Sequence, residues 1–280
     1  SGSIEYQAHV GGVGWQNYAT NGNLAGTTGQ GRAMEAIKIK LTGDLATKYD
    51  IYYRVHVGGV GWLDWASNDQ IAGTVGYSKK LEAIEIRLVE KGALAPGSIQ
   101  TPNMIKPITV MYQAHVGGVG WQDYVENGET GGTTGQSKEL EALNIIINNK
   151  VNVGGSIEFQ AHVGGIGWQN YVGTNQVAGT TGQAKALEAI KIRLTGDLAN
   201  KYDIYYRVHV GGVGWLDWAS NDQVAGTVGY GKKLEAIEIE IVEKGHSAPG
   251  STQTPNMIKP ITIMYQAHVG GVGWQDYMEN

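Results

Sequence analysis

The sequence predicts an all-β protein built from six copies of one short module. The string His-Val-Gly-Gly-Val/Ile-Gly-Trp occurs six times in 280 residues. Glycine supplies 43 residues, about twice its usual share, and Tyr and Trp far outnumber Phe, which favours tight turns and amphipathic aromatic surface over a helical bundle. Self-similarity at a fixed spacing indicates a repeat architecture. The signature histidines are His9, His56, His115, His162, His209 and His268.

The spacing of these histidines shows a short period that recurs within a long one. Successive intervals are 47, 59, 47, 47 and 59 residues, and positions 153 residues apart correspond throughout. We therefore predict two near-identical domains, residues 1–153 and 154–280, with three modules each. The glycine-rich stretch Lys150 to Gly155 is the expected joint.

Three strands are predicted in each module. In module one, Ile4 to Val10 alternates apolar and polar residues, as a half-buried strand does. Gly11 to Gly14 follows as a turn, and a second strand runs from Trp15 to about Tyr18. Ile37 to Leu41 alternates again, and a short helical turn near Arg32 to Glu35 is the only helix expected.

One three-stranded unit buries too little surface, so the modules must share a core. Tandem pseudo-three-fold domains, β-prism-like or β-trefoil-like, are the expected fold, and a six-bladed β-propeller is the alternative because the third-to-fourth interval is an ordinary 47 residues. In the tandem arrangement, Leu143 to Ile147 pairs back onto Ile4 to Val10. Ile157 to Val163 is then an open edge at which another chain could pair.

Composition excludes several classes of function. The net charge is −5 without any basic block, so we expect no nucleic-acid partner. Cysteine is absent, which excludes disulfides and thiolate metal sites. No apolar run is long enough for a membrane helix, so membrane insertion is not expected. Ser1-Gly2-Ser3 is typical of a tag remnant, and we expect the chain to be part of a longer protein.

One tryptophan ends the signature in every module. An exposed indole could stack on a pyranose ring, while a buried one would serve a symmetric core equally well, and the strand alternation cannot decide between these interpretations. The six signature tryptophans are Trp15, Trp62, Trp121, Trp168, Trp215 and Trp274.

The residues that follow each signature tryptophan complete the candidate ligand-binding set. Planar Asn and Asp groups suit paired sugar hydroxyls, although hydrogen bonding at strand ends is an equal explanation. Trp65 and Trp218 replace Tyr in modules two and five, and we expect partial exposure there. The added candidates are Asn17, Tyr18, Asp64, Trp65, Asp123, Tyr124, Asn170, Tyr171, Asp217 and Trp218.

No catalytic, metal or cofactor site is expected. Each signature histidine stands alone in its module, so a structural hydrogen bond is favoured over a metal ligand. The recurring glutamates, such as Glu35, do not form the pair across one bond that a glycosidase needs. Bonding to the backbone of the Gly-Thr-Thr-Gly turn is their expected role.

The strings His-Val-x-x-x-Gly-Trp, Gly179-Thr180-Thr181-Gly182 and Leu187-Glu188-Ala189-Ile190 resemble the clostridial hydrophobic repeat with a conserved tryptophan, the ChW repeat. The match covers nearly the whole chain. The resemblance implies a secreted or cell-surface bacterial protein whose repeats bind glycans, cell wall or other proteins, and it carries no catalytic residues. The Gly-Gly of the turn departs from the polar residue common in the family.

Together these observations predict a non-catalytic, multivalent binding module for carbohydrate or cell-wall glycan. The alternative is a structural or protein–protein interaction region that mediates adhesion or assembly. Weak sites repeated on one scaffold gain avidity for a polymer, which favours the first hypothesis.

Overall fold

A computed structural model describes residues 1–260 and 264–279. The all-β prediction is confirmed, since the only helices are two six-residue ones, α1 (Gly43–Lys48) and α2 (Gly196–Lys201), within these residues. The expected helical turn at Arg32 to Glu35 is wrong, because β4 begins there at Met34. Among the described residues, no helix is long and apolar enough to span a membrane.

Each complete module begins and ends with a long strand, and the two pair antiparallel. The first strands are β1 (Ile4–Val10), β5 (Tyr49–Val57), β11 (Ile108–Val116), β16 (Ile157–Val163) and β21 (Tyr202–Val210). The last strands are β4 (Met34–Leu41), β9 (Leu81–Glu90), β15 (Leu140–Asn149), β20 (Leu187–Leu194) and β25 (Leu234–Glu243). The strand predicted at Ile4 to Val10 is confirmed, and the one at Ile37 to Leu41 starts three residues earlier.

Two short strands, rather than one running from Trp15 to Tyr18, follow each glycine turn and pair back onto the first strand. The turn strands are β2 (Gly14–Trp15), β6 (Gly61–Trp62), β12 (Gly120–Trp121), β17 (Gly167–Trp168), β22 (Gly214–Trp215) and β29 (Gly273–Trp274). The next are β3 (Ala19–Thr20), β7 (Ala66–Ser67), β13 (Val125–Glu126), β18 (Val172–Gly173), β23 (Ala219–Ser220) and β30 (Met278–Glu279). In module six, β27 (Met264–Tyr265) and β28 (His268–Val269) pair with β30 and β29.

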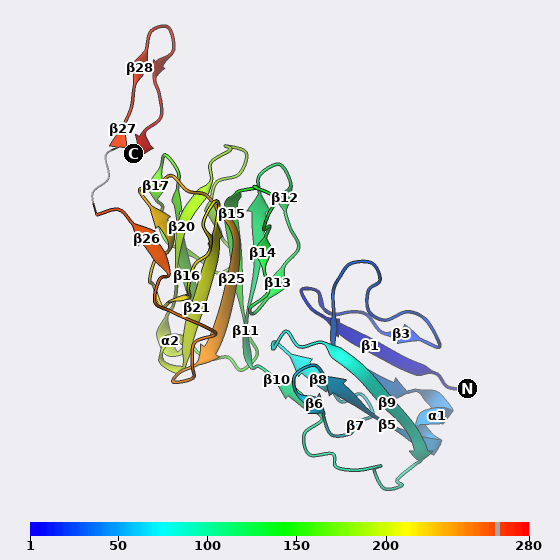
Figure 1. Cartoon of the computed structure of the whole chain (residues 1–280). Coiled ribbons are helices and arrows are strands. Elements are labelled where there is room, and N and C mark those ends of the chain that lie inside the picture. The colour runs from blue at the N-terminus through cyan, green and yellow to red at the C-terminus, as the bar shows by residue number, and fades with distance from the viewer. Residues whose placement is uncertain (261–263, 280) are drawn as a thin grey trace. The chain divides into compact units, whose positions relative to one another are not determined.

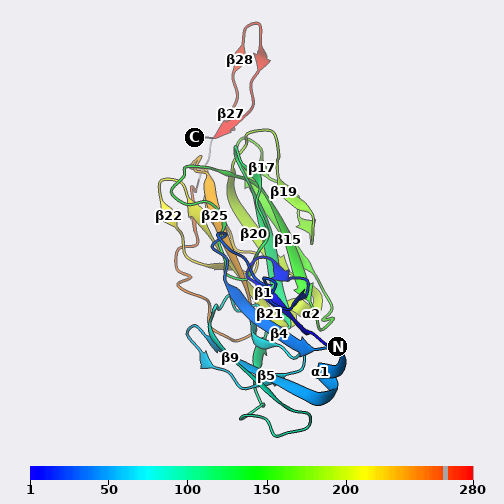
Figure 2. The same cartoon turned by 90° about the vertical axis from the view of Figure 1, so that its right-hand side faces the viewer.

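In modules two to five, a linking strand from the glycine–threonine string pairs with the last strand of another module. These strands are β8 (Ala72–Val75), β14 (Gly131–Gly132), β19 (Val177–Gly179) and β24 (Ala225–Val228). β19 pairs with β15, β24 pairs with β20, and β14 pairs with β25. Each of modules three, four and five therefore adds one short strand to the sheet of another of the three, and together they form a closed ring. This three-sheet, prism-like ring contradicts the six-bladed alternative (Figures 1 and 2).

The compact units of the chain are Ser1–Lys106 (unit 1) and Pro107–Asn280 (unit 2). This division differs from the expected boundary at 153/154. Gly155 lies inside unit 2, where a Cβ would stand 1.9 Å from the carbonyl oxygen of Thr195, so glycine there permits close packing instead of marking a linker. The proline-bearing loops follow modules two and five and end in β10 (Asn103–Ile105) and β26 (Asn256–Ile258), which pair in parallel with β8 and β24.

Two expected strand relationships are wrong. β15 pairs with β11 and β19, not with β1. The strand β16 is not an open edge, because β20 pairs along one side of it while β17 and β18 cover the other.

The core of unit 2 lies between the inner faces of its three sheets. Its buried side chains come from the first and last strands of all three modules, and include Tyr112, Phe159 and Tyr206. Unit 1 shares the linking pattern, since β8 pairs with β4, but it holds two modules and a smaller core around Tyr53.

Candidate functional site

A β-bulge places the recurring glutamate beside the signature histidine. In module one His9 faces Ala36 and Val10 faces Met34, which leaves Glu35 as the extra residue of β4. The same register shift occurs in all five complete modules. A bulge re-aims a side chain out of the regular alternation. Glu35 therefore turns toward the outer face that carries His9.

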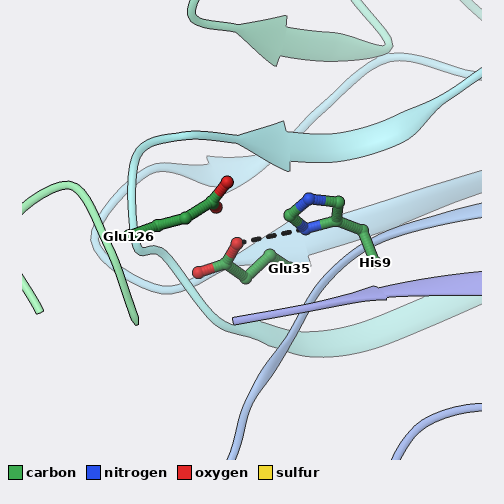
Figure 3. A group of neighbouring side chains, drawn as sticks. All are labelled: His9, Glu35 and Glu126. Carbon is green, nitrogen blue, oxygen red and sulfur yellow. Dashed lines mark ion pairs between the residues drawn. The ribbon is translucent and has the colours of Figure 1, made fainter. Parts of the chain in front are cut away.

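The glutamate and the histidine form a pair in every complete module. The distance between Glu Oε2 and His Nδ1 is 3.2 Å for His9, 3.1 Å for His56, 2.9 Å for His115, 3.2 Å for His162 and 3.1 Å for His209. Figure 3 shows the pair of Glu35 and His9. The carboxylate is thus the structural partner of the histidine. The expected bonds to the Gly-Thr-Thr-Gly turn are made by the glutamate backbone, since the carbonyls of Glu141 and Glu235 accept hydrogen bonds from the N–H groups of Thr180 and Thr133 at 2.9 Å.

The first glycine of the turn leaves room for this carboxylate. A Cβ at Gly58 would lie 3.1 Å from Glu82 Oε1, and one at Gly211 would lie 3.1 Å from Glu235 Oε1. The first glycine of the signature thus allows the glutamate of modules two and five to lie close to the turn.

The histidine in turn supports the tryptophan. The two residues stand opposite each other on the first strand and the turn strand, as His9 and Trp15 do. In all six modules the rings meet edge to face, with centroids 5.2–5.5 Å apart and planes at 74–80°. Such geometry is favourable for aromatic rings, so each indole is held in one orientation.

The signature tryptophans lie outside the core. Trp62 is 43% exposed and Trp121 is 39% exposed, while Trp15, Trp168 and Trp215 are half-buried. The core-packing interpretation is therefore wrong for these residues. Each of these rings is therefore at least partly exposed to solvent.

A cation covers one face of the indole in four modules. Lys38 lies 5.0 Å from the centre of the Trp15 ring, and Arg54 lies 4.8 Å from that of Trp62. Lys191 and Arg207 do the same for Trp168 and Trp215. Such contacts stabilise the ring and occupy one of its two faces.

Module three departs from this pattern. The positions that carry Arg54 and Lys38 in the other modules hold Gln113 and Asn144, and within the described residues no Lys or Arg lies over Trp121. Asp123, two residues along, is exposed. Trp121 is thus the most open signature tryptophan of the closed ring of modules three to five.

Trp65 and Trp218 are buried, at 4% and 6% exposure, so the expected partial exposure is wrong. The long loops cover them. The backbone N–H of Trp65 donates to the Ser98 carbonyl at 2.9 Å. A Cβ at Gly97 would lie 3.1 Å from the indole Nε1 of Trp65. These tryptophans anchor the loops instead of offering a free ring.

Asp64 holds the same loop. Its Oδ2 accepts hydrogen bonds from Ser98 Oγ at 2.8 Å, from the Thr101 N–H at 2.9 Å and from Thr101 Oγ1 at 3.0 Å. The backbone bond from Thr101 and the other donors lower the pKa of Asp64. Asp217 repeats this arrangement with Ser251 and Thr254. In both cases the loop already occupies the carboxylate that the sequence had suggested for a ligand.

The tyrosines after the signature join neighbouring modules. Tyr18 donates its hydroxyl hydrogen to Asp69 of module two at 2.5 Å, and Lys40 lies 4.0 Å from the centre of its ring. Tyr171 repeats this with Asp222 and Arg193, and its burial and the bond to Asp222 raise its pKa to about 12. Tyr124 instead donates to Asn144 Oδ1 at 3.2 Å.

Each outer face carries the signature tryptophan of the candidate set. In modules one, three and four an exposed polar residue of the set follows it, namely Asn17, Asp123 or Asn170. Sequence reasoning missed the glutamate–histidine support and the covering cations. The Glu-Ala string that recurs at the start of every last strand was the available signal for the former.

The fold and this outer surface define a tandem-repeat β module that displays one supported tryptophan per repeat. The family model for Clostridial hydrophobic W (ChW) matches residues 9–43, 56–90, 115–149, 162–196 and 209–243, which together make up more than half of the chain. The chain belongs to this family. No curated protein and no solved structure matches the chain.

Proposed function

We propose that this chain is a non-catalytic, multivalent module that binds carbohydrate, with bacterial cell-wall glycan as the leading class. The observation that carries the proposal is the exposure of the signature tryptophans, which in each complete module are held by a histidine that pairs with a glutamate. A ring that is held in one orientation before binding loses little entropy when it binds.

The ring of modules three to five presents this surface three times, on Trp121, Trp168 and Trp215. Because the modules close around one core, the three copies face outward around a pseudo-three-fold arrangement. A polymer or a glycan-covered surface can engage several copies, and repeated weak contacts then give strong overall binding.

An extracellular or cell-surface location is part of the proposal, because cell-wall polymers lie there. No role as an enzyme is included, since the repeated surface offers the same groups in each module and family membership assigns a repeat module rather than a catalytic centre.

The test is binding of the labelled full chain to an array of glycans that includes purified bacterial cell-wall polymers. The account expects saturable binding to at least one polysaccharide class. A folded chain, verified by circular dichroism, that binds nothing on the array would contradict it.

Variants at one turn sharpen the test. Trp121→Ala removes the most open indole of the closed ring and should weaken polymer binding several-fold. Val119→Ala is the matched control, because Val119 is exposed on the same turn but carries no ring. Equal losses for the two variants would show that the indole is not the contact.

A further inference from the structure

The last strand of unit 1 exposes an apolar face that its counterpart in unit 2 buries. Ile84, Ile86 and Leu88 of β9 are 41%, 50% and 53% exposed. Their counterparts 153 residues on, Ile237, Ile239 and Ile241 of β25, are 0%, 0% and 1% exposed.

This exposed face belongs to the inner side of its sheet. Ile84 pairs with Val55, Ile86 with Tyr53 and Leu88 with Ile51, and all three partners are buried core residues. The face therefore continues the core of unit 1 outward to solvent. A contiguous exposed apolar patch of this kind marks an interaction site.

Unit 2 shows what covers such a face. Module three supplies the cover: the N–H of Ile239 donates to Tyr112 Oη at 3.0 Å, and β14 pairs with β25. Unit 1 holds only two modules, and neither provides this third position.

Module six carries nearly the same sequence as the part of that cover that holds Tyr112. Residues 261–280 correspond to residues 108–127, with Ile263 in place of Val110 and Met278 in place of Val125 as the two differences. By sequence, residues 264–279 correspond to β11 from Met111 onward, to β12 and to β13. Tyr265, the counterpart of the buried Tyr112, is 49% exposed.

We propose that module six of one copy of this chain docks on the β9 face of unit 1 of a second copy. Tyr265 then lies against Ile86 as Tyr112 lies against Ile239 in the closed ring. Module six of a second copy is not tethered to this unit 1, so the length of the connecting chain does not limit its approach. Because the two surfaces differ, the contact is head-to-tail and each added copy leaves one surface free for the next.

The experiment is sedimentation velocity of the full chain over a wide range of protein concentration. The average mass should rise above the 30.0 kDa of one chain without a fixed end point. A mass that stays at one chain at every concentration would overturn the proposal.

Two single variants locate the contact. Ile86→Asp and Tyr265→Ala change exposed side chains, so both should keep the fold and both should abolish the rise in mass. Leu94→Asp is the control, because Leu94 is 94% exposed in unit 1 outside β9, and it should associate like the parent chain.

Mixing the two variants gives the decisive reading. The Ile86→Asp copy keeps module six and the Tyr265→Ala copy keeps the β9 face, so the mixture should form a dimer and nothing larger. Association of Ile86→Asp alone, or a mixture that stays monomeric, would contradict a head-to-tail contact between these surfaces.

Discussion

The hydroxyl of Tyr112 accepts a hydrogen bond from the backbone N–H of Ile239 at 3.0 Å, across 127 residues of chain. This contact joins the first module of the unit 2 ring to its last. Tyr206 makes the equivalent contact with Ile192 and Tyr53 with Ile39, whereas module four has Phe159, which has no hydroxyl, at this position.

Tyr112→Phe should therefore lower the free energy of unfolding of unit 2 by about 1–2 kcal/mol, because the buried Ile239 N–H loses its acceptor. Chemical denaturation of the full chain measures this change. Tyr124→Phe, which removes a hydroxyl from a half-buried ring, is the comparison and should cost less. Equal stability of Tyr112→Phe and the parent would show that this bond does not hold the ring closed.

Trp218→Ala should destabilise unit 2 by about 3–5 kcal/mol, because it empties a buried site under the long loop. The loop, residues 245–256, should also become sensitive to proteases. Trp215→Ala in the same module is the control, since a half-buried ring on the outer face contributes less to packing. The reverse order of stabilities would contradict the assignment of the two tryptophans to the core and the surface.

Gly132→Ala should disrupt the pairing of β14 with β25. At this position φ is +98°, and a Cβ would lie 2.4 Å from the carbonyl oxygen of Glu235. Gly135→Ala isolates the cost of the backbone conformation, because φ there is +71° but nothing lies within 4 Å, and it should cost about 1 kcal/mol. Thermal unfolding compares the two, and a similar loss for both would contradict the close approach.

Asp50 makes the stability of unit 1 depend on pH. Hydrogen bonds from the Gly92 N–H, Lys91 and Asn68 lower its pKa to about 2. A lowered pKa in the folded state stabilises the fold above the unfolded value near 3.9, and this contribution is lost as the pH falls through about 2. Asp50→Asn should cost about 1 kcal/mol at neutral pH, and the difference from the parent should vanish near pH 2. A difference that persists in acid would contradict this origin.

The repeat, the strand class and the first strand were predictable because alternation and self-similarity are local signals, as at Ile4 to Val10. The linking strands were not, since Gly-Thr-Thr-Gly shows no alternation and its pairing partner belongs to another module. Gly155 suggested a linker, although it serves close packing against Thr195. The 59-residue intervals were the better signal, because the loops that lengthen them follow modules two and five.

The candidate site was predictable only in part, for a similar reason. Period-two alternation places Trp15 on one face of its strand but cannot tell which face meets solvent. The bulge at Glu35 breaks the alternation, so the pair with His9 was not visible in the pattern. The burial of Trp65 depends on a loop more than thirty residues away in sequence.

The most direct test of the account is an NMR titration that follows the eight indole N–H signals. The probe is a soluble fragment preparation of bacterial cell-wall polymer, and single Trp→Phe variants assign the signals. The account predicts that signals of the signature tryptophans shift, with Trp121 shifting more than Trp168 and Trp215 of the same ring, while Trp65 and Trp218 stay in place. Shifts confined to Trp65 and Trp218, or no shift at any indole, would contradict it.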